Sequence, residues 1–338
     1  MGLRTLRPVA WAALPGCLYA QPPVAMPEYR PEARLKGVVR VLGNSHMDAL
    51  MAFWQEGFRR LHPDVTFQEK YLGTANAIAG LYLETADIAL MGREILPIED
   101  VAYRRAFPEG PLDVAVATAS FNVPLETFAF AIFVNRRNPI EKLTLAELDA
   151  IFGCDCKLGA PAAIWTWGDV GLTGEWAARP IRLHGYETNS GLGYFFQQKV
   201  LGGSHKWNCG LQEYLNAYGS GRKLLANAGD MIVKAIEQDS GAIGFCGFGH
   251  ATDGVKALAL SEGGRSYVPL TRESVANRSY PLTRTVYIFV NRKPATPIVR
   301  EFLRYVLSAQ GQEEVARQSV YLPLPAETVR KELAKLRD

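Results

Sequence analysis

Strand-like segments alternate with helix-like segments from residue 38 onward, and this alternation restricts the fold more than any other feature of the sequence. Residues 38–42 form the continuous apolar run of a buried strand, and 47–61 repeat their apolar residues with helical spacing. The pattern continues with strands at 65–71, 87–91 and 114–119 and with helices at 75–84 and 97–107. This order predicts an α/β lobe built on a parallel-type sheet.

The second half of the chain restarts the same scheme. Its predicted strands lie at 128–135, 181–184 and 242–245, and its predicted helices lie at 145–152, 191–201 and 231–238. The chain has 338 residues, of which 48% are hydrophobic and 21% charged, so it is long enough for two packed cores and too apolar to be disordered. We therefore expect a second α/β lobe.

One short internal repetition links the two halves. Residues 131–139, AIFVNRRNP, resemble 287–294, YIFVNRKP, and both are read as strands that end in an Asn-Arg turn. A chain that leaves one lobe on one strand and returns on another would show such a pair. Chance similarity between two buried strands explains the likeness equally well.

The first residues are typical of an export signal. Arg4 and Arg7 precede an apolar stretch that ends at Ala20, which predicts a signal peptide over 1–20 and a proline-rich tether over 21–37. The motif Leu14-Pro15-Gly16-Cys17 loosely resembles a lipobox, so a lipid anchor at Cys17 stands beside simple cleavage after Ala20. The apolar stretch is shorter than the roughly 20 residues of a spanning helix, and we expect no membrane span.

Charge and cysteine content exclude several classes of protein. Without Arg4 and Arg7, the chain has 35 basic and 34 acidic residues. A net charge near +1 does not predict binding to nucleic acid or anionic lipid. Apart from Cys17, the chain has an even number of cysteines, and in an exported protein these could form one or two disulfides. They are Cys154, Cys156, Cys209 and Cys246. Their spacing does not fit zinc, and we expect neither a metal nor a cofactor.

Hydroxyl and amide residues follow predicted strands at three junctions, each just before a helix. The junctions are Gly43-Asn44-Ser45-His46, Gly73-Thr74-Ala75-Asn76 and Thr188-Asn189-Ser190-Gly191. Because a helix start leaves backbone N–H groups unpaired, each junction can hold an anion or a polar oxygen. Ser45, Thr74 and Ser190 could instead be ordinary helix caps.

Two more residues join this edge as candidates. His46 at a helix start exposes a ring that can donate to a ligand, and Arg93 follows the strand at 87–91, although it could pair with Glu94 or Glu99. No nucleophile lies beside a base in the sequence pattern, so we expect a binding protein and no catalytic residues.

Motifs in this order resemble the PstS-like phosphate-binding proteins of ABC transporters, which have the type II periplasmic binding fold. The likeness covers residues 38–324, and the matching stretches include GNSHMDALMAFW, GTANAIAGL, ADIALMGREI, LTLAELDAIF, NSGLGYFF, SGAIGFCGFG and YPLTRTVYIFVNRKP. The resemblance implies a two-lobed α/β clamp with a ligand cleft between the lobes. It also implies a periplasmic location and an ABC transporter permease as partner.

The resemblance carries some binding positions over and alters others. Ser45 and His46 fall on its first hydroxyl-bearing loop, Thr74 on its second, and Ser190 with Gly191 on its Ser-Gly-Thr loop. By contrast, Gly92 stands where the family has a Ser or Asp acceptor, Tyr186 replaces its arginine, and Leu192 replaces its threonine. Because a buried dianion needs nearly complete pairing, these changes favour a ligand other than phosphate, and Tyr186 would face its organic part.

The sequence thus predicts an exported, monomeric substrate-binding protein of an ABC-type transporter that closes on a small anion or polar molecule. Residues 38–120 with 271–338 form lobe 1, and 121–270 form lobe 2. The proposed ligand-binding residues are Ser45, His46, Thr74, Arg93, Tyr186, Ser190 and Gly191. A sensor or interaction module without transport, and a phosphatase-like relative, are the alternatives.

Overall fold

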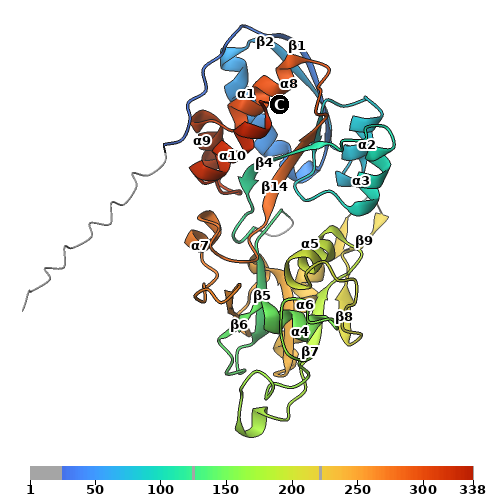
Figure 1. The fold of residues 1–338 in the computed structure, drawn as a ribbon, viewed down its shortest axis with the longest axis vertical. Helices are drawn as coiled ribbons and strands as arrows, with labels where there is room; N and C mark the ends of the chain where they lie inside the picture. Colours follow the sequence, from blue (N-terminus) through green and yellow to red (C-terminus); the bar gives the residue numbers. More distant parts are fainter. Residues whose placement is uncertain (1–24, 124–125, 221–222, 338) are drawn as a thin grey trace, which may run out of the picture.

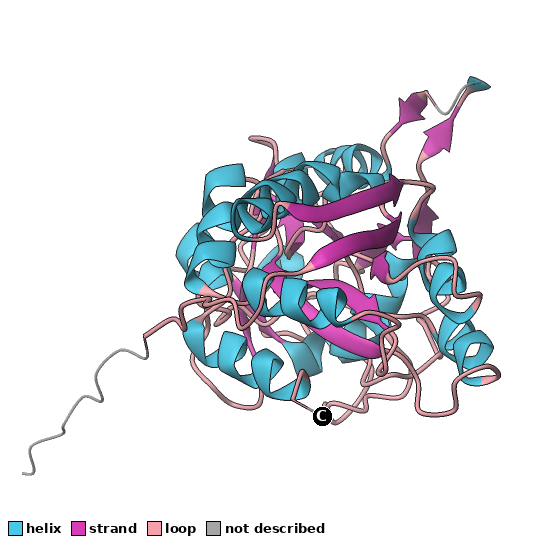
Figure 2. Ribbon diagram, turned by 90° about the horizontal axis from the view of Figure 1, so that it is seen from above, coloured by secondary structure: helices cyan, strands magenta, loops and turns pink. Residues whose placement is uncertain are grey.

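The computed structural model describes residues 25–123, 126–220 and 223–337, and in it the chain forms two lobes stacked along the long axis of the molecule (Figure 1). The predicted signal peptide at 1–20 and Cys17 lie outside these residues. Helices flank the strands on both sides when the molecule is seen from above (Figure 2). The predicted two-lobed α/β class is confirmed.

The first lobe is built on a five-stranded sheet in the order β2-β1-β3-β14-β4. The strands are β1 (Lys36–Gly43), β2 (Asp64–Lys70), β3 (Ile88–Leu90), β4 (Leu112–Thr118) and β14 (Thr285–Val290). β1 is parallel to β2 and β3, while β14 is antiparallel to β3 and β4. The late strand β14 therefore enters a sheet whose other strands come from the beginning of the chain.

Helices bury the apolar side chains of this sheet. They are α1 (Asp48–Leu61), α2 (Ala77–Tyr82), α3 (Pro97–Arg104), α8 (Pro297–Val306), α9 (Ala309–Gln318) and α10 (Ala326–Lys335). Trp54 and Phe58 of α1 are fully buried with Phe302 of α8, because the apolar positions of each helix recur on one face. This core sets the position of the α1 N-terminus at the cleft.

The second lobe repeats the design with the sheet order β12-β5-β11-β7-β8. Its strands are β5 (Phe130–Asn135), β7 (Arg182–Tyr186), β8 (Leu211–Tyr214), β11 (Ala242–Gly247) and β12 (Val255–Ala257). Two-stranded pairs are added by β6 (Lys142–Thr144) with β13 (Ala259–Ser261) and by β9 (Ala217–Tyr218) with β10 (Leu224–Ala226). The helices are α4 (Leu145–Phe152), α5 (Gly191–Val200), α6 (Ala228–Gln238) and α7 (Arg272–Ala276).

Aromatic side chains fill the core of the second lobe. The rings of Phe196 and Phe245 stack with centroids 3.8 Å apart, and Phe152 meets Phe245 edge-on at 5.6 Å. This packing ties α4 and α5 to β11, because Phe152 and Phe196 lie on those helices. The N-terminus of α5 is thereby held at the edge of the sheet that faces the first lobe (Figure 1).

Two segments of the chain cross between the lobes, and they are hydrogen-bonded to each other. The outgoing crossing lies between β4 and β5, and the return crossing lies between α7 and β14. The backbone N–H of Ala119 donates to Arg284 O at 3.1 Å, and that of Phe130 donates to Leu282 O at 3.1 Å. The repeated segments at 131–139 and 287–294 flank these crossings as β5 and β14. The predicted lobe boundaries stay a prediction, and burial of Leu282 in the second core favours a return crossing that lies beyond residue 271.

The proline-rich segment predicted as a tether over 21–37 contacts the first lobe in its described part. Tyr29 is buried in the first core, where its hydroxyl donates to Glu301 Oε1 at 2.7 Å and lies 2.7 Å from His62 Nε2. An aromatic residue that can bury its ring and satisfy its hydroxyl anchors a proline-rich segment that composition alone reads as extended. The chain is thus fixed to the first lobe before β1 begins.

The one or two disulfides that the sequence allows are absent among the described residues. Cys154, Cys156, Cys209 and Cys246 are all free thiols. Cys246 lies buried in the middle of the second sheet, whereas Cys154 and Cys209 are exposed. An even count of cysteines therefore does not bring them together here. Among the described helices we find none with the length and apolar run needed to cross a bilayer.

Candidate functional site

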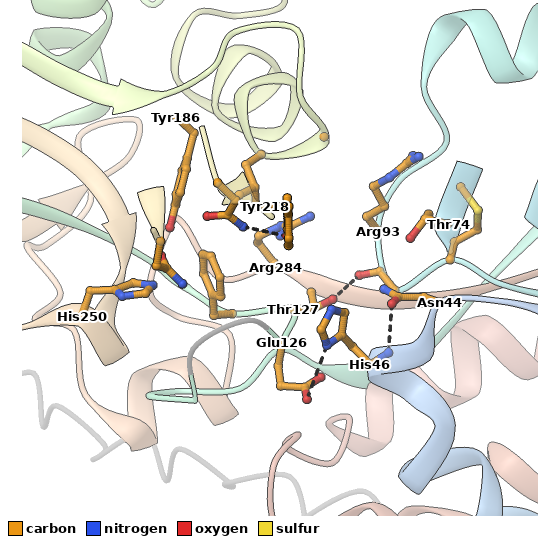
Figure 3. Close-up of a pocket in the computed structure, with 17 residues that line it drawn as sticks. Asn44, His46, Thr74, Arg93, Glu126, Thr127, Tyr186, Tyr218, His250 and Arg284 are labelled. Carbon is orange, nitrogen blue, oxygen red and sulfur yellow. Dashed lines mark hydrogen bonds and ion pairs between the residues drawn. The ribbon is translucent and has the colours of Figure 1, made fainter. Parts of the chain in front are cut away.

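A cavity of about 240 Å³ lies between the lobes, at the level of the two crossings. Residues from both lobes and from the crossings line it, as Figure 3 shows. Asn44, His46 and Thr74 come from the first lobe, and Tyr186 and His250 come from the second. This is the cleft between lobes that the two-lobed fold predicts.

The first-lobe wall is formed where β1 ends. A Cβ at Gly43 would lie 2.3 Å from Leu90 O, so glycine allows β1 to approach β3 closely before the chain turns into the cleft. Asn44 then caps the short 3-10 helix η1 (Ser45–Met47), and its Oδ1 accepts from His46 N at 2.9 Å. Because Oδ1 is occupied, the Nδ2 donor of Asn44 is the part of the amide left for a ligand.

The structure separates the two readings of the predicted hydroxyl residues. Ser190 caps α5, accepting from Gly193 N at 3.0 Å and donating to Glu187 O at 2.6 Å, and it does not line the cavity. Ser45 is exposed and also lies outside the lining. Thr74 does line it, and Gly73, not Thr74, is the N-cap of the 3-10 helix η2 (Thr74–Asn76). Thr74 is therefore the hydroxyl that is free to meet a ligand.

Five of the predicted residues share the cavity: His46, Thr74, Arg93, Tyr186 and Gly191. Their ligand-binding roles stay a prediction.

Arg93 reaches from the first lobe across to the second, but its charge is already paired. It forms hydrogen bonds to both carboxylate oxygens of Glu99, at 2.7 and 2.9 Å, and donates to Glu94 O at 2.6 Å. A Cβ at Gly191 would lie 2.7 Å from Arg93 Cδ, so the absence of a side chain there lets the arginine lie against the start of α5. Arg93 closes one side of the cavity and contributes little net charge.

Arg284 is the binding candidate that sequence reasoning missed. It lies on the return crossing directly before β14, is 3% exposed and lines the cavity. Its Nη2 lies 3.6 Å from Glu94 Oε2, and its Nε has no hydrogen-bond partner among the described residues. Burial lowers the pKa of this guanidinium, because the charged form is poorly solvated. In the sequence, its position directly before the apolar strand TVYIFV is the feature that could have marked it as a candidate.

The outgoing crossing contributes Glu126 and Thr127. Burial raises the pKa of Glu126, whose Oε2 accepts from Tyr321 Oη at 2.7 Å and whose Oε1 lies 4.0 Å from His46 Nδ1. Thr127 Oγ1 donates to Gly92 O at 2.5 Å. Neither residue follows a strand-to-helix junction, so the search for such junctions could not find them.

The second-lobe wall is largely aromatic and uncharged. Tyr186 is buried beside Phe128 and Phe130, and burial raises the pKa of its hydroxyl well above the ordinary value. Its Oη accepts from Gly247 N at 3.5 Å, and burial keeps the phenol neutral. His250 adds a buried ring whose Nδ1 lies 2.7 Å from Asp230 Oδ1. Among the described residues that line this wall, none is an arginine or a lysine, whereas the return crossing supplies Arg284.

The cavity thus combines one buried arginine that has spare donor capacity with amide, hydroxyl and imidazole groups and with the carboxyl group of Glu126. This chemistry suits a small anion, because each ligand oxygen can meet a donor while the arginine supplies opposite charge. Across the part of the chain that the structure describes, no group of three or more His, Cys, Asp or Glu residues is arranged to hold a metal ion.

Comparison with known proteins agrees with this description. A model of a PBP superfamily domain matches residues 30–310. The phosphate-binding protein PstS of Pseudomonas aeruginosa is 33% identical over 317 residues, which are 92% of this chain and 91% of that protein. Protein SphX of Synechococcus elongatus is 26% identical over 298 residues, or 86% of this chain and 79% of SphX.

The fold has a counterpart among solved structures. An ABC-type phosphate transport receptor from Vibrio cholerae superposes with a TM-score of 0.54 at 21% identity, covering 85% of this chain and 100% of that one.

Proposed function

We propose that this chain, which belongs to the PBP superfamily and is a PstS-like substrate-binding protein, binds phosphate or a closely similar oxyanion in the cleft between its lobes. The family is shown by the match over residues 30–310 and by the 33% identity with a PstS protein over 92% of the chain. The identity of the ligand is our proposal, supported by the names of these relatives and by the chemistry of the cleft.

Arg284 is the observation that carries the proposal. The sequence favours a ligand other than phosphate because Tyr186 stands at the position of the family's arginine. A guanidinium that is 3% exposed, with Nε unpartnered, supplies a positive charge from the return crossing instead. Because a buried anion gains most from a desolvated and hydrogen-bonding partner, the main argument against phosphate loses its basis.

The remaining parts of the function follow from the family and are also proposals. We propose an exported, periplasmic monomer that delivers its ligand to the permease of an ABC transporter, with no catalytic activity of its own. Closure would bring the first-lobe donors Asn44 and Thr74 toward Gly191 at the start of α5, pivoting on the paired crossings. The binding role of Ser45 and Ser190 would need backbone groups or a rearranged hydroxyl, since neither side chain lines the cavity.

A ligand panel tests the proposal. The protein is mixed with phosphate, arsenate, sulfate, an amino acid or a small carboxylic acid, and its melting temperature is measured, followed by calorimetric titration of each stabilising compound. Phosphate at a hundredfold excess over its dissociation constant should stabilise the protein by about 2.7 kcal/mol. Stabilisation by a carboxylic acid or an amino acid, and by no oxyanion, would contradict the proposal.

The hydrolase alternative has a separate test. A chromogenic phosphate monoester should remain intact in the presence of the protein, while inorganic phosphate still binds. Turnover that disappears in Arg284→Met and persists in a surface variant such as Arg182→Gln would assign catalysis to the cleft and contradict a binding-only role.

A further inference from the structure

A groove lies at the end of the first lobe that is remote from the cleft. β14 starts at the return crossing and ends at Val290, so Asn291 lies at the far end of that lobe (Figure 1). Two adjoining cavities there, of about 320 and 150 Å³, share the residues Glu109, Asn291, Arg292 and Lys293. We call the two cavities together the outer groove, and none of its lining residues lines the cavity between the lobes.

The interior of the outer groove is largely apolar. In the larger cavity the rings of Tyr103 and Phe107 pack with centroids 5.3 Å apart. The hydroxyl of Tyr103 donates to Asn291 Oδ1 at 2.7 Å, and burial raises its pKa to about 12, so it carries no charge. The smaller cavity is lined by the aliphatic side chains of Leu112, Val290, Val299, Leu303 and Leu336. These walls can contact an apolar ligand but offer it little hydrogen bonding.

The turn that shapes the larger cavity is fixed by its own hydrogen bonds. The backbone N–H of Phe107 donates to Tyr103 O, and that of Gly110 donates to Phe107 O, both at 3.0 Å. Gly110 has φ of +75°, and a Cβ there would lie 2.6 Å from Arg104 Nη2. Glycine thus leaves room for Arg104, whose Nη1 donates to Pro108 O at 3.1 Å. A ligand would therefore not have to order this wall when it binds.

The rim of the outer groove carries positive charge that is not compensated. Arg292 and Lys293 line both cavities, and Arg300 lines the smaller one. None of these three cations forms an ion pair with a residue that the structure describes, whereas Lys335 is paired with two carboxylates of its own lobe. Among the described lining residues, Glu109 is the one carboxylate. Three unpaired cations beside one acid give the groove a net positive charge that attracts an anion.

We propose that the outer groove binds a small carboxylate with an apolar body, which lies between the apolar walls while the carboxylate meets Arg292 and Lys293. An apolar cavity of roughly 150 Å³ can bind benzene, so a ring of that size or a short alkyl chain fits even the smaller part of the groove. A guanidinium can bind both oxygens of a carboxylate in parallel. An inorganic anion such as phosphate would leave the apolar walls without a partner.

Calorimetric titration with phenylacetate and octanoate tests the inference and distinguishes a ring from a chain. The titrations are made in saturating phosphate and are repeated in Arg284→Met, so that binding in the cleft between the lobes is recognised. At least one of the two carboxylates should bind equally well to the wild type and to Arg284→Met. Acetate, which lacks the apolar body, and benzyl alcohol, which lacks the charge, should bind about tenfold more weakly or not at all.

Paired substitutions at the rim locate the site. Arg292→Gln combined with Lys293→Gln should weaken binding of the carboxylate about tenfold and leave the affinity for phosphate unchanged. Arg272→Gln is the matched control, because Arg272 is exposed and lies outside the groove, and it should change neither affinity. The inference is overturned if the wild type binds neither carboxylate, if binding survives in the double variant, or if it is lost in Arg284→Met. A peptide rich in glutamate and leucine that bound at the rim when neither carboxylate did would assign the groove to a protein partner and refute it as well.

Discussion

Replacement of Arg284 by methionine should weaken ligand binding strongly and leave unliganded stability nearly unchanged. The side chain is 3% exposed, its Nε has no hydrogen-bond partner among the described residues, and Glu94 Oε2 lies 3.6 Å from Nη2, which is longer than a hydrogen bond. Such a charge is kept at a cost to folding, as the lowered pKa of the guanidinium indicates. Methionine fills a similar volume and removes that cost.

The expected change in free energy differs between the unliganded and the liganded protein. In the unliganded protein, methionine removes the desolvation cost of the buried guanidinium but also loses its contacts with two aromatic rings. The ring centroids of Phe195 and Phe130 lie 5.1 and 5.7 Å from the guanidinium. A cation over an aromatic ring contributes about 0.5 to 2 kcal/mol, so the free energy of unfolding should stay within about 1 kcal/mol. With the anion bound, loss of a buried charged partner costs about 2 to 5 kcal/mol, or roughly 30- to several thousandfold in affinity.

Two measurements check this prediction. Urea denaturation gives the unliganded stability, and calorimetric titration with phosphate gives the affinity. Arg278→Met is the matched control, because Arg278 is a partly buried arginine whose Nη1 has no hydrogen-bond partner among the described residues, but it lies outside the cavity lining. Its affinity for phosphate should be unchanged. An Arg284→Met variant that binds phosphate as tightly as the wild type, or that unfolds, would refute the reasoning.

Four further predictions concern the scaffold. Tyr29→Phe should lower the free energy of unfolding by about 1 to 3 kcal/mol in urea denaturation, since it leaves buried partners of the hydroxyl unpaired. Burial lowers the pKa of His62, so on acidification the unfolded chain takes up a proton at this histidine before the folded protein does. The free energy of unfolding should therefore fall as the pH drops below about 6.5. If a variant with another residue in place of His62 kept the same dependence of stability on pH, His62 would be excluded as its source. Thiol labelling of the native protein, mapped by mass spectrometry, should modify Cys154 and spare Cys246 until unfolding, because burial raises the pKa of the Cys246 thiol. Ser190→Ala should cost about 1 kcal/mol of unliganded stability through loss of the α5 cap, and an unchanged urea midpoint would contradict that role.

Local periodicity was enough to predict most of the fold. The helix expected at 47–61 is present as η1 followed by α1, and the strand expected at 242–245 is the first part of β11, because each buries a continuous apolar face. Short exposed strands such as β9 carry no such periodicity and were missed. Tyr29 was missed for another reason, since its anchoring depends on partners far along the chain, at Glu301.

The candidate site was predictable only where it follows a strand-to-helix junction. His46, Thr74 and Gly191 lie at such junctions and line the cavity. Arg284 and Thr127 come from the crossings, which have no helix start and no repeat pattern. Their position depends on the pairing of two segments far apart in sequence, through the Ala119–Arg284 and Phe130–Leu282 hydrogen bonds, and that pairing has no local signal.

This difference explains why a comparison position by position gave too strong an argument against phosphate. Gly92 and Tyr186 lack the acceptor and the charge expected at those positions, yet Thr127 Oγ1 lies 3.1 Å from the place of a Cβ at residue 92, and Arg284 supplies a cation to the same cavity. A binding cleft requires a donor, an acceptor or a charge at a point in space, and any segment that reaches the point can supply it. In this protein the crossings bring Glu126, Thr127 and Arg284 to the cavity. Substitutions at the lobe edges should therefore be judged together with the residues of the crossings before a ligand is excluded.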